Sequence, residues 1–144
     1  RVFDLVKNYK SKGVGEICGL WVSRTLKGKG IGDLLMTLAV AVSPYIQVNV
    51  MLGFCSPYTF KSLKKMGFVH DKTLSNDGQF LYSNKNILST VIIIKDVTLL
   101  HSAQDTKREE IYHIRKNFGE KITICNNQYN VFLDNQLEIE MILQ

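Results

Sequence analysis

A short segment rich in glycine and lysine contains the residue types that bind anions. It reads KGKGIG over residues 27–32, and the apolar run LLMTLAVAV follows it. Glycine lets a backbone approach a ligand closely, and the free N–H groups at a helix N-terminus attract negative charge. Lys27 and Lys29 would add positive charge at the rim. A strand, a glycine-rich turn and a helix in this order predict a phosphate-binding loop. The alternative is a flexible loop whose glycines only let the chain turn.

Two common nucleotide-binding motifs do not fit this segment. A P-loop requires G-x-x-x-x-G-K-S/T, but the residue five positions after Gly28 is Asp33. The dinucleotide fingerprint G-x-G-x-x-G also fails, because Gly32 arrives one residue early and no acidic residue follows at a strand end about twenty residues later. The loop alone therefore does not select the phosphate ligand.

The segment resembles the Gln/Arg-x-x-Gly-x-Gly/Ala signature of the GCN5-related N-acetyltransferase (GNAT) superfamily. Lys27 takes the Gln/Arg place, and Gly30 and Gly32 match the two small residues. The preceding ICGLWV and the following LLMTLAVAV match the superfamily's strand and helix in type and spacing.

A second block agrees with this resemblance. SPYTFKSLKKMGF is similar to the superfamily's later helix, Asn-x-x-Ala-x-x-x-Tyr-x-x-x-Gly-Phe, with Ser56 for the Asn and Gly67–Phe68 as the closing pair. Two blocks in the right order, with a strand between them, are more specific than either alone. The resemblance covers roughly residues 14–100.

The resemblance implies an α/β fold with a mixed sheet, of the α+β type, that opens between two neighbouring strands and holds acetyl-CoA or another acyl-CoA there. Main-chain atoms of Leu20, Trp21 and Val22 would contact the acyl-pantetheine, and the Val22 region would polarise the thioester. The pyrophosphate would rest on the loop. The loop residues expected at the cofactor are Lys27, Gly28, Lys29, Gly30, Ile31, Gly32 and Asp33.

Acyl transfer to an amine needs a base for the amine proton and an acid for the departing thiolate. Glu16 lies eleven residues before Lys27, and by resemblance it matches the base of the histone-acetyltransferase branch. The alternative is a strand-end carboxylate that faces solvent. The superfamily's leaving-group Tyr is replaced by Leu63, so Ser56 or Tyr58 on the same helix would substitute, and Tyr58 is equally well explained as a packing residue.

Other reactive side chains are weaker candidates. Cys55 would lie near the thioester, but we favour a small buried cysteine over a covalent intermediate. Trp21 is expected in the core. The spacing of His70, His101 and His113 is not that of metal ligands, so no metal is expected.

Hydrophobic patterns predict the elements that position these residues. Strands are expected at 15–23, 45–54, from FLY at 80, and at 90–100, and helices at 32–42 and 56–68. RVFDLVKNYK also has helical spacing, though it is short. The predicted buried stripe of the first long helix is Ile31, Leu34, Leu35, Leu38, Ala39 and Val42, and that of the second is Phe60, Leu63 and Met66.

The C-terminal part is predicted to be an accessory unit. Ser102 and Asp105 form a capping-box start for a charged helix with Ile111, Ile114 and Phe118 on its apolar side. KITIC, YNVFL and LEIEMIL then resemble strands. We expect a partial GNAT-like domain at 1–100 and an accessory helix with strands packed on it at 101–144, the alternative being the start of a further domain.

The amino-acid composition indicates the general class of protein. The chain has 144 residues, 45% of them hydrophobic, and a net charge of +5, which suits one basic globular domain. Basic charge favours anionic partners, but neither an aromatic platform nor a groove-reading helix supports nucleic-acid binding. Three scattered cysteines predict a reducing, cytoplasmic setting, and no apolar run approaches a membrane span.

About fourteen residues precede the first predicted strand, so the superfamily's N-terminal half is expected to be missing. A fragment, a partner chain or a CoA-binding remnant would each explain this. An unpaired sheet edge would favour a homo-oligomer or a partner chain that completes the sheet. The predicted function is acyl-CoA-dependent transfer, with an acetyl group expected, to a small-molecule or peptide amine. The alternative is a non-catalytic CoA-binding or protein-interaction module.

Overall fold

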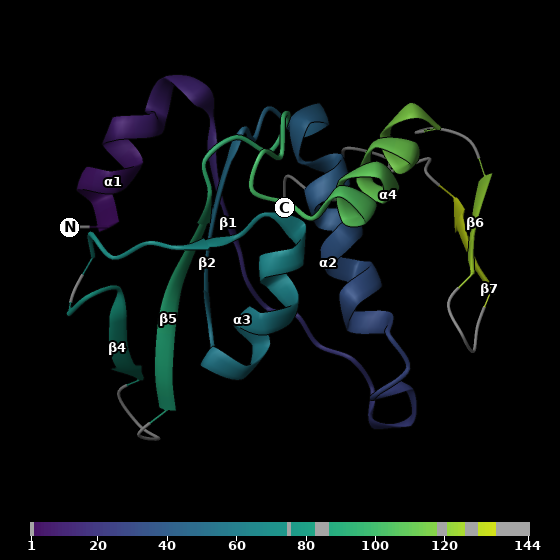
Figure 1. Cartoon of the computed structure of the whole chain (residues 1–144), viewed down its shortest axis with the longest axis horizontal. Coiled ribbons are helices and arrows are strands. Elements are labelled where there is room, and N and C mark those ends of the chain that lie inside the picture. The colour runs from purple at the N-terminus through teal and green to yellow at the C-terminus, as the bar shows by residue number, and fades with distance from the viewer. Residues whose placement is uncertain (1, 75, 83–86, 118–120, 126–129, 135–144) are drawn as a thin grey trace.

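The structure, a computed structural model, describes residues 2–74, 76–82, 87–117, 121–125 and 130–134. A mixed sheet forms its centre. The α1 helix covers one face of the sheet, and α2, α3 and α4 cover the other (Figure 1). A two-stranded hairpin lies beyond α4, apart from the main sheet (Figure 1).

The main sheet has the strand order β1-β2-β5-β3, and β4 also pairs with β5. The β1–β2 pair is parallel, and the three pairs that involve β5 are antiparallel. The strands are β1 (Val14–Ile17), β2 (Val50–Cys55), β3 (Val69–His70), β4 (Gln79–Tyr82) and β5 (Ile87–Ile94); the hairpin is β6 (Lys121–Cys125) with β7 (Asn130–Asp134).

Four α-helices and four 3-10 turns are described. The helices are α1 (Val2–Tyr9), α2 (Ile31–Val42), α3 (Pro57–Leu63) and α4 (Asp105–Lys116). The 3-10 turns are η1 (Lys10–Lys12), η2 (Arg24–Leu26), η3 (Ser43–Ile46) and η4 (Lys64–Met66). The parallel β1–β2 pair is joined through α2, so the N-terminus of α2 follows the loop that leaves β1.

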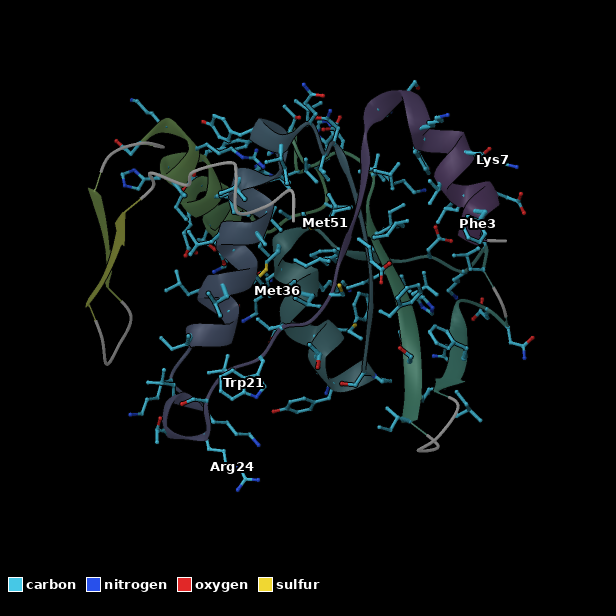
Figure 2. All side chains as sticks on the ribbon, turned by 180° about the vertical axis from the view of Figure 1, so that it is seen from behind. Phe3, Lys7, Trp21, Arg24, Met36 and Met51 are labelled. Atoms are coloured by element: carbon cyan, nitrogen blue, oxygen red, sulfur yellow. The ribbon has the colours of Figure 1, made fainter. Side chains whose placement is uncertain are left out.

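The larger core lies between the sheet and α2, α3 and α4. Figure 2 shows Met36 of α2 and Met51 of β2 in this layer, where both side chains are buried. Ile111 and Ile114 of α4 belong to the same cluster. The predicted inward face of α4 is therefore confirmed for these two residues, while Phe118 and the LEIEMIL run lie outside the described residues. The proposed domain boundary at residue 100 stays a prediction.

The sequence predicted which segments are strands better than it predicted the residues at which these strands begin and end. The predicted strand 15–23 ends at Ile17, because Gly19 turns the chain with a φ of +70°. The predicted strand 45–54 begins only at Val50, because the chain continues from α2 into a 3-10 turn at Ser43–Ile46. The predicted strand 90–100 runs instead from Ile87 to Ile94.

Two predictions of local detail are wrong. Leu35 is 41% exposed, and the buried residues of α2 are Leu34, Met36, Thr37, Val40 and Ala41. Met36 and Val40 of this helix share a core cluster with residues of the sheet and of α4, so one narrow apolar stripe does not describe its buried surface. The capping box at Ser102 is also absent, because the Ser102 hydroxyl donates to the Gly67 carbonyl and Gln104 is the N-cap of α4.

Candidate functional site

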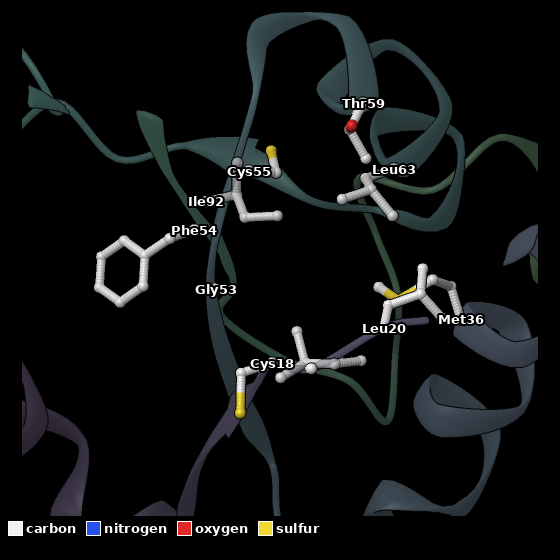
Figure 3. Close-up of a pocket in the computed structure, with 11 residues that line it drawn as sticks. Cys18, Leu20, Met36, Gly53, Phe54, Cys55, Thr59, Leu63 and Ile92 are labelled. Carbon is white, nitrogen blue, oxygen red and sulfur yellow. The ribbon is translucent and has the colours of Figure 1, made fainter. Parts of the chain in front are cut away.

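The parallel strands β1 and β2 separate at their carboxyl ends. Ile17 and Gly53 form the last register pair, and the chain after Ile17 turns away toward α2. A cleft of about 360 Å³ opens beside this point, between the end of the sheet, α2 and α3 (Figure 3). Its lining residues are Ile17, Cys18, Gly19, Leu20, Met36, Gly53, Phe54, Cys55, Thr59, Leu63 and Ile92.

The cleft is lined by uncharged side chains. Leu20 and Met36 approach it from the loop and α2, and Leu63 approaches from α3 (Figure 3). Cys55 is partly buried, and this burial raises the pKa of its thiol above the ordinary value. The Thr59 hydroxyl lies 2.9 Å from the Ser56 hydroxyl. A cleft of this kind suits an extended, largely apolar group better than a charged one.

The loop before α2 leaves unpaired amides at the start of the helix. Gly30 is the N-cap with a φ of +77° and no side-chain cap hydrogen bond. The first helical bond runs from the Leu34 amide to the Gly30 carbonyl at 3.0 Å. In the part of the chain that the structure describes, the amides of Ile31, Gly32 and Asp33 have no hydrogen-bond acceptor. They are therefore available to an anion.

The loop and the cleft are adjacent. A Cβ atom placed on Gly32 would lie 3.8 Å from Val22 Cγ2 and 3.9 Å from Leu20 Cδ2. Leu20 also lines the cleft, so the first turn of α2 lies at one end of it. Lys27 is exposed and Lys29 is partly buried, and the Lys29 amide donates to Leu26 O at 3.2 Å. Of the other loop residues, Gly28 is exposed and Ile31 is partly buried.

Glu16, the predicted base, is exposed and is not a lining residue of the cleft. Its register partner is Leu52, which belongs to the core on the α1 side of the sheet, as does Val14. Since side chains alternate along a strand, Glu16 shares that face, whereas Ile17 faces the α2 side. A direct role at the cleft would require a water or the substrate to bridge the two faces.

The predicted N-cap of α3 is confirmed, and its two candidate acids differ in position. The Ser56 hydroxyl accepts a hydrogen bond from the Thr59 amide at 3.2 Å. Tyr58 is 83% exposed, so the alternative of a packing residue is wrong. The core position expected for Trp21 is also wrong, because its side chain is 77% exposed (Figure 2). Leu20 and Val22 face α2, which leaves Trp21 between them directed outward.

Sequence reasoning missed Lys107, which reaches the N-terminal turn of α2 from α4. Its ammonium lies 2.9 Å from Asp33 Oδ2 and 2.6 Å from Glu110 Oε2. Burial disfavours the charged ammonium, but the hydrogen bonds to Glu110 and Asp33 outweigh it and raise the pKa of Lys107. Only the spacing of Lys107 and Glu110 was visible in the sequence, and it equally fits a solvated helix face.

Neither a metal-binding cluster nor a membrane-spanning helix occurs in the described ranges. No three His, Cys, Asp or Glu side chains there gather in a way that could hold a metal ion. None of the described helices combines the length and apolar composition needed to cross a membrane.

The chain is similar to a known protein in its fold. No family model and no curated protein sequence matches the chain. Among solved structures, FeeM, an N-acyl amino acid synthase from uncultured soil microbes, aligns with a TM-score of 0.55 and 12% sequence identity. The alignment covers 75% of this chain and 57% of that one, so this chain spans little more than half the length of FeeM. The predicted mixed α+β class is confirmed, and the likeness supports a GNAT-like fold.

Proposed function

We propose that this chain is an acyltransferase that binds an acyl-CoA in the cleft and transfers the acyl group to an amine. The observation that carries the proposal is the separation of the parallel strands after the Ile17–Gly53 pair. This separation opens an apolar cleft whose far end is the uncapped N-terminus of α2. A ligand with an apolar arm and a diphosphate has the shape and charge to fill both parts.

The donor would lie with its diphosphate on the amides of Ile31, Gly32 and Asp33. The pantetheine arm would extend past Leu20 into the cleft. Lys27 and Lys29 would add positive charge outside the diphosphate, which strengthens binding at low ionic strength. FeeM, which has a similar fold, is an N-acyl amino acid synthase, and this supports N-acyl transfer as the class of reaction. An acetyl group is the acyl group proposed from the loop signature, and the acceptor would be a small-molecule or peptide amine.

The reaction would be direct attack of a neutral amine on the thioester carbonyl. The amide near Val22 would stabilise the oxyanion, and Glu16 would take the amine proton through a bridging water. The departing thiolate would receive a proton from solvent, relayed through the exposed Ser56–Thr59 hydroxyl pair, because Thr59 lines the cleft. Tyr58, which is directed to solvent at the start of α3, is the other candidate for this step.

A non-catalytic acyl-CoA-binding module is the second candidate. The observation that favours it is the absence of any carboxylate or imidazole among the described residues that line the cleft. Leu63 also occupies the position where the GNAT superfamily, which the sequence resembles, often has the tyrosine that protonates the leaving thiolate. Such a module would keep donor binding and lose turnover.

Donor binding is tested by calorimetric titration of desulfo-CoA into the native chain, Gly32→Ala and Gly32→Glu. The alanine Cβ would make only ordinary contacts, so this variant serves as the matched control. We expect Gly32→Ala to bind and Gly32→Glu to lose binding, because its carboxylate would repel the diphosphate. Absence of binding to the native chain would refute both candidates.

Turnover separates the two candidates. Release of free CoA thiol is followed with acetyl-CoA and longer acyl-CoAs against a panel of amines that includes amino acids. An enzyme releases thiol in an amine-dependent way, whereas a binding module does not. With an active pair in hand, Glu16→Gln should lower kcat with little change in donor affinity. Full activity of this variant would remove Glu16 from the mechanism.

A further inference from the structure

The last described helix is attached to both ends of α2. At the N-terminal end, the Lys107 ammonium contacts Asp33 Oδ2 at 2.9 Å and Thr37 Oγ1 at 3.4 Å. At the C-terminal end, the Arg115 guanidinium donates to Val40 O at 2.9 Å and to Ala41 O at 3.2 Å. Ile111 and Ile114 fill the core between these contacts. The position of α2 therefore depends on α4.

The contact at Lys107 also determines where a negative charge lies. An aspartate in the first turn of a helix is attracted by the free amides there. Asp33 is instead paired with Lys107, whose side chain is only 14% exposed and is held by Glu110 as well. The Asp33 carboxylate accepts no backbone hydrogen bond from the described residues. It is thus directed sideways, toward α4.

We propose that Lys107 is a positioning residue for the acyl donor, because it holds the Asp33 carboxylate against α4 and leaves the first turn of α2 open to a diphosphate. This inference rests on the proposed function. It gives residues 105–116 a role in donor binding although the helix does not line the cleft. Without Lys107, Asp33 and Glu110 would put two uncompensated negative charges beside the diphosphate, and the Asp33 carboxylate would be free to accept the amides itself.

The test is a double-mutant cycle between Lys107 and Asp33, measured as the affinity of the full chain for desulfo-CoA. We expect Lys107→Met to bind on the order of five- to tenfold more weakly than the native chain. Asp33→Asn should bind at least as tightly as the native chain, because it removes a negative charge near the diphosphate. In the Asp33→Asn background, Lys107→Met should change the affinity by less than about twofold.

Two controls separate positioning from support of the fold. Lys116→Met removes an exposed lysine of the same helix and should bind as the native chain does. Lys107→Arg keeps the charge and should restore most of the affinity. If Lys107→Met does not fold, as judged by urea unfolding, Lys107→Arg and Asp33→Asn still test the idea, which requires both to retain binding.

Equal losses from Lys107→Met in the native and Asp33→Asn backgrounds would overturn the inference and leave the proposed function standing, since such losses indicate a packing role. A loss of binding in Asp33→Asn alone would overturn it too. A native chain that does not bind desulfo-CoA would remove the proposed function and this inference with it.

Discussion

Ile17 of β1 and Gly53 of β2 approach closely where the two strands separate. A Cβ atom on Gly53 would lie 3.0 Å from Ile17 Cγ2 and 3.3 Å from the Ile17 carbonyl oxygen, so a side chain there would push the strands apart. The cleft begins at this pair. The shape of the proposed donor site therefore depends on a glycine outside the glycine-rich loop.

Gly53→Ala should lower the free energy of unfolding by about 1–2 kcal/mol, because the added methyl group overpacks against β1. Urea unfolding measures the change. Gly32→Ala is the matched control, since its methyl group meets only ordinary contacts and should leave stability unchanged or slightly raised. Equal stability of Gly53→Ala and the native chain would show that the strands adjust easily at this point.

Arg115→Met should destabilise the chain by about 1.5–3 kcal/mol, because carbonyl groups lose a charge-assisted hydrogen bond and are left partly buried. The acceptors are the carbonyl oxygens of Val40, Ala41, Val97 and Thr98. Burial lowers the pKa of the Arg115 guanidinium, but it stays charged at neutral pH. Lys116→Met, on the exposed side of α4, should be neutral. A small effect of Arg115→Met in urea unfolding would mean that α4 contributes little to the position of α2.

The Lys107 ion pairs predict a stability difference that disappears at high pH. The pKa of Lys107 is raised in the folded chain, so its contribution is fully present below the ordinary lysine pKa of about 10.4 and is lost as the pH rises through the higher folded value. In urea unfolding at pH 8, the native chain should therefore have a higher free energy of unfolding than Lys107→Met. This difference in free energy should become smaller above about pH 10.5. A gap that does not change with pH would assign the effect to packing.

Cys55 should react slowly with iodoacetamide at neutral pH, because burial raises its pKa and the thiolate is the reactive form. Its rate should increase as the pH is raised above 9.0, the ordinary value. Desulfo-CoA should protect Cys55, which lines the cleft. Mass spectrometry of a variant with Cys18 and Cys125 changed to Ser measures both effects. A rate that desulfo-CoA does not alter would mean that the ligand binds outside the cleft.

The sequence predicted the elements around the site because the signals were local. As expected, Ser56 is the N-cap where α3 begins, and Gly67 is the left-handed C-cap where η4 ends. Both signals involve only the adjacent turn of helix, so they can be recognised in the sequence. Ile111 and Ile114 showed the buried face of α4 by their spacing alone.

Long-range relationships could not be predicted in the same way. The pairing of Lys107 with Asp33 joins residues from two distant helices, and no local pattern records it. The exposure of Trp21 follows from the side on which α2 packs rather than from its own hydrophobicity. Which face of the sheet Glu16 occupies depends on the register of β1 against β2. A strand of four residues contains too little pattern to specify this register.

Individual backbone amides at the start of α2 should respond to the bound donor. Two-dimensional ¹H–¹⁵N spectra of the native chain are recorded during titration with desulfo-CoA. We predict the largest shifts at Ile31, Gly32 and Asp33, with accompanying shifts at Leu20 and Cys55. Saturable binding that leaves the three helix amides unmoved, or shifts confined to residues away from the cleft, would contradict the proposal that α2 and the separated strands hold the donor.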